Sequence, residues 1–174
     1  NNQLLVADID ELRVFDVDSS KQIMSYSVYE ENPMLNDVAI SEGGEVFITS
    51  SGLHGVFRLE NDSLRLAFQH DSLLQYANGI AIKKDVLTVV GWNIAEISLT
   101  ENSIKQIFTS PTLNDFDGLE FGVNGNLFCS QVSESGKLWR VNSKGQANLV
   151  LNHADYLADF DFAKIDEKEY LLIA

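Results

Sequence analysis

The chain contains one cysteine and two prolines among its 174 residues, and it has no long apolar run. Cys129 cannot form an internal disulfide, and its apolar surroundings, LFCSQV, predict a buried structural thiol. The scarcity of proline and the lack of low-complexity segments argue against a disordered chain. No stretch reaches the roughly 20 apolar residues of a membrane span, and the opening NNQLLVADID lacks the basic start and apolar core of a signal peptide. We therefore expect a globular domain without a membrane span.

Basic residues are scarce as well. Twelve lysine and arginine residues stand against 26 aspartate and glutamate residues, so the formal net charge is -14. That sign is wrong for binding a phosphate backbone, and nucleic acid is not expected as a partner. The histidines His54, His70 and His153 lie far apart and are expected at the surface, and no cluster of histidine and cysteine suggests a zinc site. The usual motifs of α/β-hydrolases, NTPases and dinucleotide enzymes are missing.

What the sequence does contain is an internal repeat. Three segments superpose, beginning at Asn36, Asn78 and Asp117, and their starts are about 40 residues apart, the length of a four-stranded propeller blade. Each copy holds four short strands rich in β-branched and aromatic residues, separated by turn residues. In the first copy these strands are VAIS, EVFITSS, VFRLE and SLRLAFQ. Because no helical period is sustained, the sequence predicts an all-β repeat protein.

The two ends of the chain are partial copies of the same unit. Residues 4–28 match the second, third and fourth strands of a blade, and ADFDFAK and YLLIA match a first and a second strand. A propeller must close on itself, because otherwise two sheet faces stand exposed. Residues 1–174 are therefore predicted to form a single β-propeller domain of four-stranded blades, as a fragment of a six-bladed ring that would need roughly 70 further residues.

Short oxygen-bearing side chains recur at one point of the repeat, just where the first strand of each copy begins. The equivalent pairs are Asn36-Asp37, Asn78-Gly79 and Asp117-Gly118. In a propeller this strand is innermost, and the loop before it opens on one face near the central channel. Such a ring of oxygens suits a hard cation such as Ca²⁺. The alternative is that these are ordinary turn residues, chosen because they tolerate positive φ.

The segments LNDVAISEGGEVFITSS, ANGIAIKKDVLTVV and FDGLEFGVNGNLFCSQ resemble successive blade openings of the senescence-marker-protein and gluconolactonase family. The resemblance implies a six-bladed propeller that binds one divalent metal at the channel mouth and hydrolyses a lactone or related ester. It implies that Asn78 and Asp117 are metal ligands and that Asp117 is also the general base. Asn36 and Asp37 would then contact the substrate, although the Asp37 carboxylate can also serve a structural role by accepting backbone N–H groups.

The sequence departs from the family pattern in two places. A metal-binding Glu near the family's first strand has no counterpart, and Met34 stands where sugar-lactone members have an Arg, which does not support a sugar as the substrate. The alternative function is a non-catalytic propeller, similar to NHL-type repeats, that binds a ligand or a protein partner. Trp92 and Trp139 are predicted to lie on strands at matching blade positions and to pack between blades. Nothing in the sequence indicates the compartment.

Overall fold

The computed structural model of the protein describes residues 2–110, 112–122, 125–132, 135–142, 144–152, 156–166 and 168–173. Within these ranges the chain forms seventeen strands in five sheets and no helix. The described chain therefore contains no helix able to cross a membrane. All-β structure is confirmed, as are the predicted three, four, four, four and two strands of the successive sheets.

The sheets follow the order of the chain, and neighbouring strands within each sheet are antiparallel. The first sheet consists of β1 (Gln3–Asp8), β2 (Glu11–Asp16) and β3 (Lys21–Ser27). The second consists of β4 (Leu35–Ile40), β5 (Val46–Ser50), β6 (Gly55–Glu60) and β7 (Ser63–Gln69). The third consists of β8 (Ile80–Lys83), β9 (Val86–Val90), β10 (Ile94–Ser98) and β11 (Ser103–Phe108).

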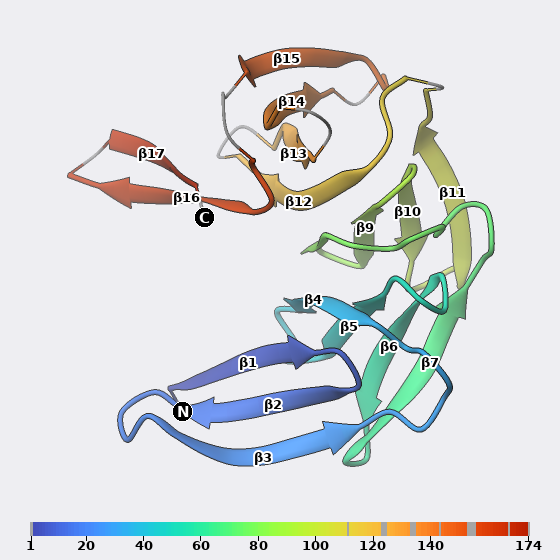
Figure 1. The fold of residues 1–174 in the computed structure, drawn as a ribbon, viewed down its shortest axis with the longest axis vertical. Coiled ribbons are helices and arrows are strands. Elements are labelled where there is room, and N and C mark those ends of the chain that lie inside the picture. Colours follow the sequence, from blue (N-terminus) through green and yellow to red (C-terminus); the bar gives the residue numbers. More distant parts are fainter. Residues whose placement is uncertain are drawn as a thin grey trace.

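The fourth sheet consists of β12 (Phe116–Phe121), β13 (Leu127–Gln131), β14 (Lys137–Val141) and β15 (Ala147–Asn152). The fifth consists of β16 (Phe160–Ile165) and β17 (Lys168–Ile173). Figure 1 shows the sheets arranged radially about a common centre, with β4 and β12 toward the centre and β7, β11 and β15 on the outside. The strands β1, β4, β8, β12 and β16 pack against one another in that order.

Four hydrophobic clusters join the sheets, one at each junction between neighbouring sheets. The second strand of each complete sheet is buried on both faces because it is covered by a sheet on either side. Cys129 lies in one such strand, and its side chain is fully buried between the third and fourth sheets. Burial also raises the pKa of its thiol. The prediction of a buried structural thiol is confirmed.

The described residues do not form a closed ring. Figure 1 shows an open side between the sheet of β1–β3 and the hairpin of β16–β17. Apolar side chains are exposed on both of these end sheets, among them Leu4, Ile23, Ile165 and Leu172. Closure of a ring would cover these faces, and the six-bladed ring stays a prediction.

Hydroxyl groups connect adjacent sheets close to the centre. The Thr49 hydroxyl accepts a hydrogen bond from the backbone N–H of Asp37 and donates one to the carbonyl of Asn78, in the segment that leads into β8. The Ser130 hydroxyl repeats this pattern between Gly118 and Ala158. Each hydroxyl therefore satisfies one buried backbone group in its own sheet and one in the next sheet.

Replacing Thr49 by valine tests this connection. The change keeps the shape of the side chain but leaves a buried N–H and a carbonyl without their shared partner, so the free energy of unfolding should fall by about 1 to 3 kcal/mol. Chemical denaturation measures the difference. The matched control is Thr88→Val in β9, because Thr88 is also buried but its hydroxyl makes no hydrogen bond to the described residues. Equal losses in the two variants would contradict the proposed connection.

Candidate functional site

A cavity of about 240 Å³ lies where the inner strands of four sheets begin. Each of these sheets contributes two consecutive residues to the lining. The lining residues are Asn36, Asp37, Asn78, Gly79, Asp117, Gly118, Ala158 and Asp159. The three pairs that the repeat pattern singled out therefore meet at one place. The fourth pair, Ala158 and Asp159, was not predicted, although the partial last copy aligns it with Asn36 and Asp37.

The backbone turns sharply just before the cavity. Met34, Tyr76 and Asp115 each stand two residues before a cavity residue, and their φ values of 46°, 52° and 63° are all in the left-handed region. Directly after this turn, the pairing of β4 with β5 and of β12 with β13 shifts its register. Such irregularities locally redirect side chains away from the regular alternation of a strand. The repeated turn places the side chains of Asn36, Asn78 and Asp117 at the cavity.

The glycines of the repeated pairs are explained by close packing of the backbone. A Cβ on Gly79 would lie 2.3 Å from the carbonyl oxygen of Asp117, and one on Gly118 would lie 2.6 Å from Oδ1 of Asp159. Neither glycine has a positive φ. The interpretation of these pairs as turns that need positive φ is therefore wrong at both glycines. Instead, the missing side chain lets neighbouring inner strands approach each other, and the N–H of Gly79 donates to the carbonyl of Asp117 at 2.8 Å.

Asp37 connects the second and third sheets. Its Oδ1 accepts a hydrogen bond from the N–H of Val38 at 2.7 Å, and its Oδ2 accepts one from the N–H of Ile80 at 2.9 Å. Burial nevertheless raises the pKa of this carboxyl group to about 6, with smaller contributions from the charges of Asp159 and Asp117. The structural role considered for Asp37 is therefore supported by two contacts. Its predicted contact with a substrate stays a prediction.

Asp117 and Asn78 come from neighbouring sheets and line the same cavity. Burial raises the pKa of the Asp117 carboxyl group to about 6, and the Asn78 side chain beside it acts in the opposite direction. The charges of Asp159 and Asp115 raise it further. A carboxylate with this pKa is mostly ionised at neutral pH and can still accept a proton, as a general base must.

Glu120 is a second carboxyl group that the repeat pattern did not indicate. It lies on β12, three residues after Asp117. Burial raises the pKa of Glu120 to about 7, and the charges of Asp161, Asp37 and Asp159 contribute to the increase. The inner strands β4 and β8 carry Ala39 and Ala81 at the equivalent position, and only the partial last copy has an acidic residue there, Asp161 on β16. The repeat therefore gives only a weak signal for Glu120. The charge of Asp159 contributes to the raised pKa values of Asp37, Asp117 and Glu120.

The side chains around the cavity that could bind a metal ion all offer oxygen atoms as ligands. Asn36 and Asn78 supply amide groups, and Asp117 and Asp159 supply carboxylates. Within the described part of the chain, no three or more His, Cys, Asp or Glu side chains are grouped so that they could hold a metal ion. The chemistry of this donor set fits a hard cation such as Ca²⁺, which accepts amide and water oxygens beside carboxylates. The metal-ligand roles of Asn78 and Asp117 stay predictions.

Histidine and tryptophan lie away from the cavity lining. His70 is exposed, as expected, whereas His54 is half-buried against Tyr76, and His153 lies outside the described residues. Trp139 lies on β14, as predicted. The strand position predicted for Trp92 is wrong, because this residue lies in the turn between β9 and β10 with 44% of its surface exposed.

The shifted carboxyl groups predict how stability depends on pH. Asp37, Asp117 and Glu120 have higher pKa values in the folded chain than their ordinary values of 3.8 and 4.5. The folded chain therefore binds more protons than the unfolded chain between about pH 4 and 7, and stability should fall as the pH rises through this window. Thermal unfolding in buffer with a chelator measures this slope.

Two substitutions distinguish the effect of a buried carboxyl group on this pH dependence from the effect of the overall negative charge. Glu120→Gln should make the slope between pH 4 and 7 shallower, because the amide cannot lose a proton. Glu42→Gln is the control, since Glu42 is exposed in the turn before β5 and should leave the slope as it is in the wild type. A slope that is the same in all three proteins would contradict the role of burial at Glu120.

Comparisons with known proteins agree with the architecture. No protein-family model and no curated protein sequence matches the chain. Virginiamycin B lyase from Staphylococcus aureus superposes with a TM-score of 0.77 at 15% identity, over 98% of this chain and 59% of that chain. A putative gluconolactonase gives 0.75 at 14%, over 98% and 67%, and a gluconolactonase from Xanthomonas campestris gives 0.70 at 15%, over 94% and 62%. The chain thus shares a propeller-type fold with gluconolactonases and a streptogramin lyase, and it spans about 59% of the lyase.

Proposed function

We propose that the protein is a metal-dependent hydrolase of a lactone or related ester, and that the reaction takes place in the cavity of the four inner strands. The observation that carries this proposal is that Asn78 and Asp117, which come from neighbouring sheets, both line one cavity of about 240 Å³. Ligands of Ca²⁺ stand about 2.3 to 2.6 Å from the ion, so the proposal requires the side-chain oxygens of these two residues to come within about 5 Å of each other.

In this proposal, Asn78 and Asp117 hold the cation, with water completing its coordination. When bound, the cation would polarise the substrate carbonyl and stabilise the developing negative charge. Asp117 draws a proton from the attacking water, for which its raised pKa is suitable. The Asn36 side chain lines the same cavity and contacts the substrate or a water molecule.

In this proposal, the main role of Asp37 is to hold the second and third sheets in place relative to each other. Both of its oxygens accept backbone N–H groups, one of them from the start of β8. The carboxylate therefore fixes the distance between Asn36 on its own sheet and Asn78 on the next. A substrate contact by Asp37 would use the remaining acceptor capacity of these oxygens.

A non-catalytic propeller that binds a ligand or a protein is the second candidate. The observation that favours it is the small number of potential ligands, because the described chain groups no three His, Cys, Asp or Glu side chains for a metal. Such a protein would use the same cavity or face for binding and would need neither the cation nor a base. Metal binding and turnover therefore distinguish the two candidates.

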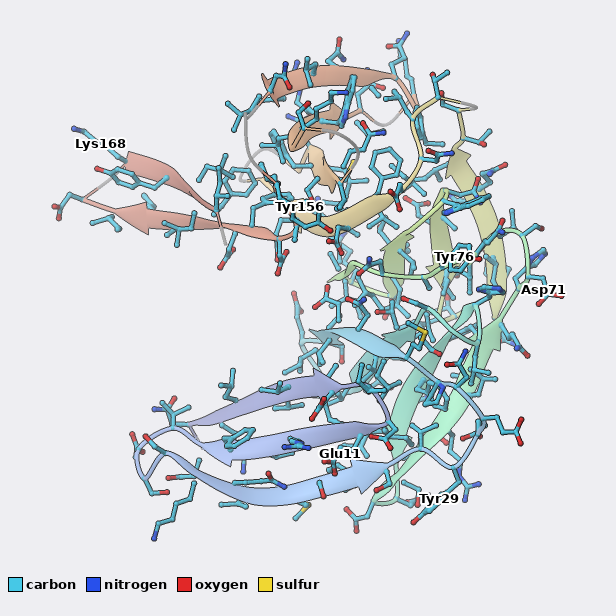
Figure 2. All side chains as sticks on the ribbon, in the orientation of Figure 1. Glu11, Tyr29, Asp71, Tyr76, Tyr156 and Lys168 are labelled. Atoms are coloured by element: carbon cyan, nitrogen blue, oxygen red, sulfur yellow. The ribbon has the colours of Figure 1, made fainter. Side chains whose placement is uncertain are left out.

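Titration calorimetry with Ca²⁺ on the full-length protein tests the cation. We expect saturable binding, and Asp117→Asn should weaken it by about tenfold or more, because the change removes a charged ligand and nearly preserves shape. Asp71→Asn is the matched control: Asp71 is exposed in the connection before β8, at the outer edge of the molecule (Figure 2). If the wild type binds no Ca²⁺, or if both variants bind it as the wild type does, the cation is not held by Asp117.

The reaction is tested with small lactones in water enriched in ¹⁸O. Hydrolysis places one ¹⁸O atom in the carboxylate of the product, whereas a carboxylate base acting in an elimination would give a product without the label. Asp117→Asn should lower the rate by about 10²- to 10⁴-fold, and Asp71→Asn should not change it. If the lactone is consumed but the product carries no ¹⁸O, the reaction is an elimination and not a hydrolysis. If no lactone is consumed, the proposed hydrolase is wrong and the non-catalytic binding propeller is the remaining candidate.

A further inference from the structure

Two aromatic side chains stand exposed near the chain segments that lead to Asn78 and Asp117. Tyr76 and Trp92 have 49% and 44% of their surfaces exposed. Their ring centroids are 5.3 Å apart with an angle of 48° between the planes, and the ring of His54 meets Tyr76 edge-on at 5.1 Å. None of the three belongs to the hydrophobic clusters between the sheets. These rings form a surface feature rather than part of the core.

The backbone holds these rings in place. The N–H of Tyr76 donates to Nδ1 of His54 at 3.1 Å, and the N–H of Trp92 donates to the carbonyl of Gln75 at 3.1 Å. Gly91 has no space for a side chain, because its Cβ would lie 2.4 Å from the carbonyl oxygen of Tyr76. His54 and Tyr76 both have positive φ, 51° and 52°. Such strained conformations persist where the surrounding structure enforces them, and they concentrate at functional sites.

The chain places the aromatic pair next to the proposed catalytic pair. Tyr76 stands two residues before Asn78, a separation of at most about 7 Å between their Cα atoms. Trp92 follows Gly91, whose carbonyl accepts a hydrogen bond from the N–H of Phe116 at 2.9 Å, and Asp117 is the next residue. Figure 2 shows Tyr76 on the viewed face, on the side of the third sheet. The rings of Tyr76 and Trp92 therefore lie near the chain segments that carry Asn78 and Asp117, outside the residues that line the cavity.

We propose that Tyr76 and Trp92 form a platform for a neutral aromatic ring of the substrate, positioned so that the substrate carbonyl lies in the cavity. The proposal rests on the proposed function and specifies its substrate class. Two exposed π faces at this spacing can stack on a planar ring or meet its edge. The substrate would then be an aryl lactone or aryl ester, whose acyl carbon is attached through oxygen to the aromatic ring.

The surroundings favour an uncharged ring over a sugar or an ion. The amide of Asn93, next to Trp92, is already engaged, because its nitrogen donates to the carbonyl of Ser72 and its oxygen accepts from Gln106. A sugar would need such groups free to pair with its hydroxyls. The net charge of -14 disfavours an anionic substrate, and a divalent cation held by Asn78 and Asp117 would repel a positively charged one.

The first test compares two lactones, dihydrocoumarin with its aromatic ring and δ-valerolactone without one. Trp92→Ala and Tyr76→Asn should each raise KM for dihydrocoumarin by about tenfold and change KM for δ-valerolactone by less than about twofold. Asparagine is used at Tyr76 because it tolerates the left-handed backbone. Tyr29→Ala is the control, since Tyr29 is 93% exposed and lies far from the cavity (Figure 2). Equal effects on both lactones, or none, would overturn the platform.

The second test measures binding without turnover. Residues 1–174 contain two tryptophans, so within this segment the fluorescence of Trp139→Phe comes from Trp92. The probe is 2-tetralone, in which a CH2 group replaces the ring oxygen of dihydrocoumarin so that no ester bond is present, and it should quench this fluorescence saturably, more weakly after Tyr76→Asn. If neither lactone is hydrolysed but the quenching saturates, the proposed function fails and the platform stands. If hydrolysis occurs without quenching, the platform is wrong and the proposed function stands.

Discussion

The structure depends on how closely the inner strands of neighbouring sheets approach each other. At Gly79 and Gly118 the next strand lies where a side chain would be, and backbone N–H groups of one sheet donate to carbonyls of the next. The same approach brings two residues from each of four sheets to one cavity. A substitution that adds even one carbon at these glycines would separate the sheets, and with them the side chains that each sheet contributes. Fold and candidate site therefore rest on the same contacts.

The cavity also brings carboxyl groups together at a cost in stability. Burial raises the pKa values of Asp37 and Asp117, and the charge of Asp159 adds to the increase. Buried negative charges without a positive partner destabilise a fold. The ion pairs of Arg13, Arg58 and Lys105 all use other carboxylates. A site of this kind is best suited to a ligand that supplies positive charge, which agrees with the proposed cation.

Much of this arrangement could be predicted from the sequence, because a repeat constrains both the strands and the position of the cavity residues. The number of strands in each sheet followed from turn residues and β-branched stretches, and Asn36, Asn78 and Asp117 followed from their equivalent positions. Glu120 was not predicted, since two of the other copies have alanine there, only the partial last copy has an acidic residue, Asp161, and only the packed structure shows the burial of Glu120. Trp92 was misplaced because aromatic residues are typical of strands, whereas the contacts that hold its ring come from a distant loop.

The left-handed residues before the inner strands have a consequence for how such a protein can change over time. Met34, Tyr76 and Asp115 share one backbone conformation although they are a thioether, a phenol and a carboxylate. The conformation is thus set by the path of the chain, and the identity of the side chain is free to vary. Each of these residues is separated by a single buried residue from a side chain at the cavity. Substitutions at these three positions can therefore change the surface beside the cavity while the side chains two residues away keep their places.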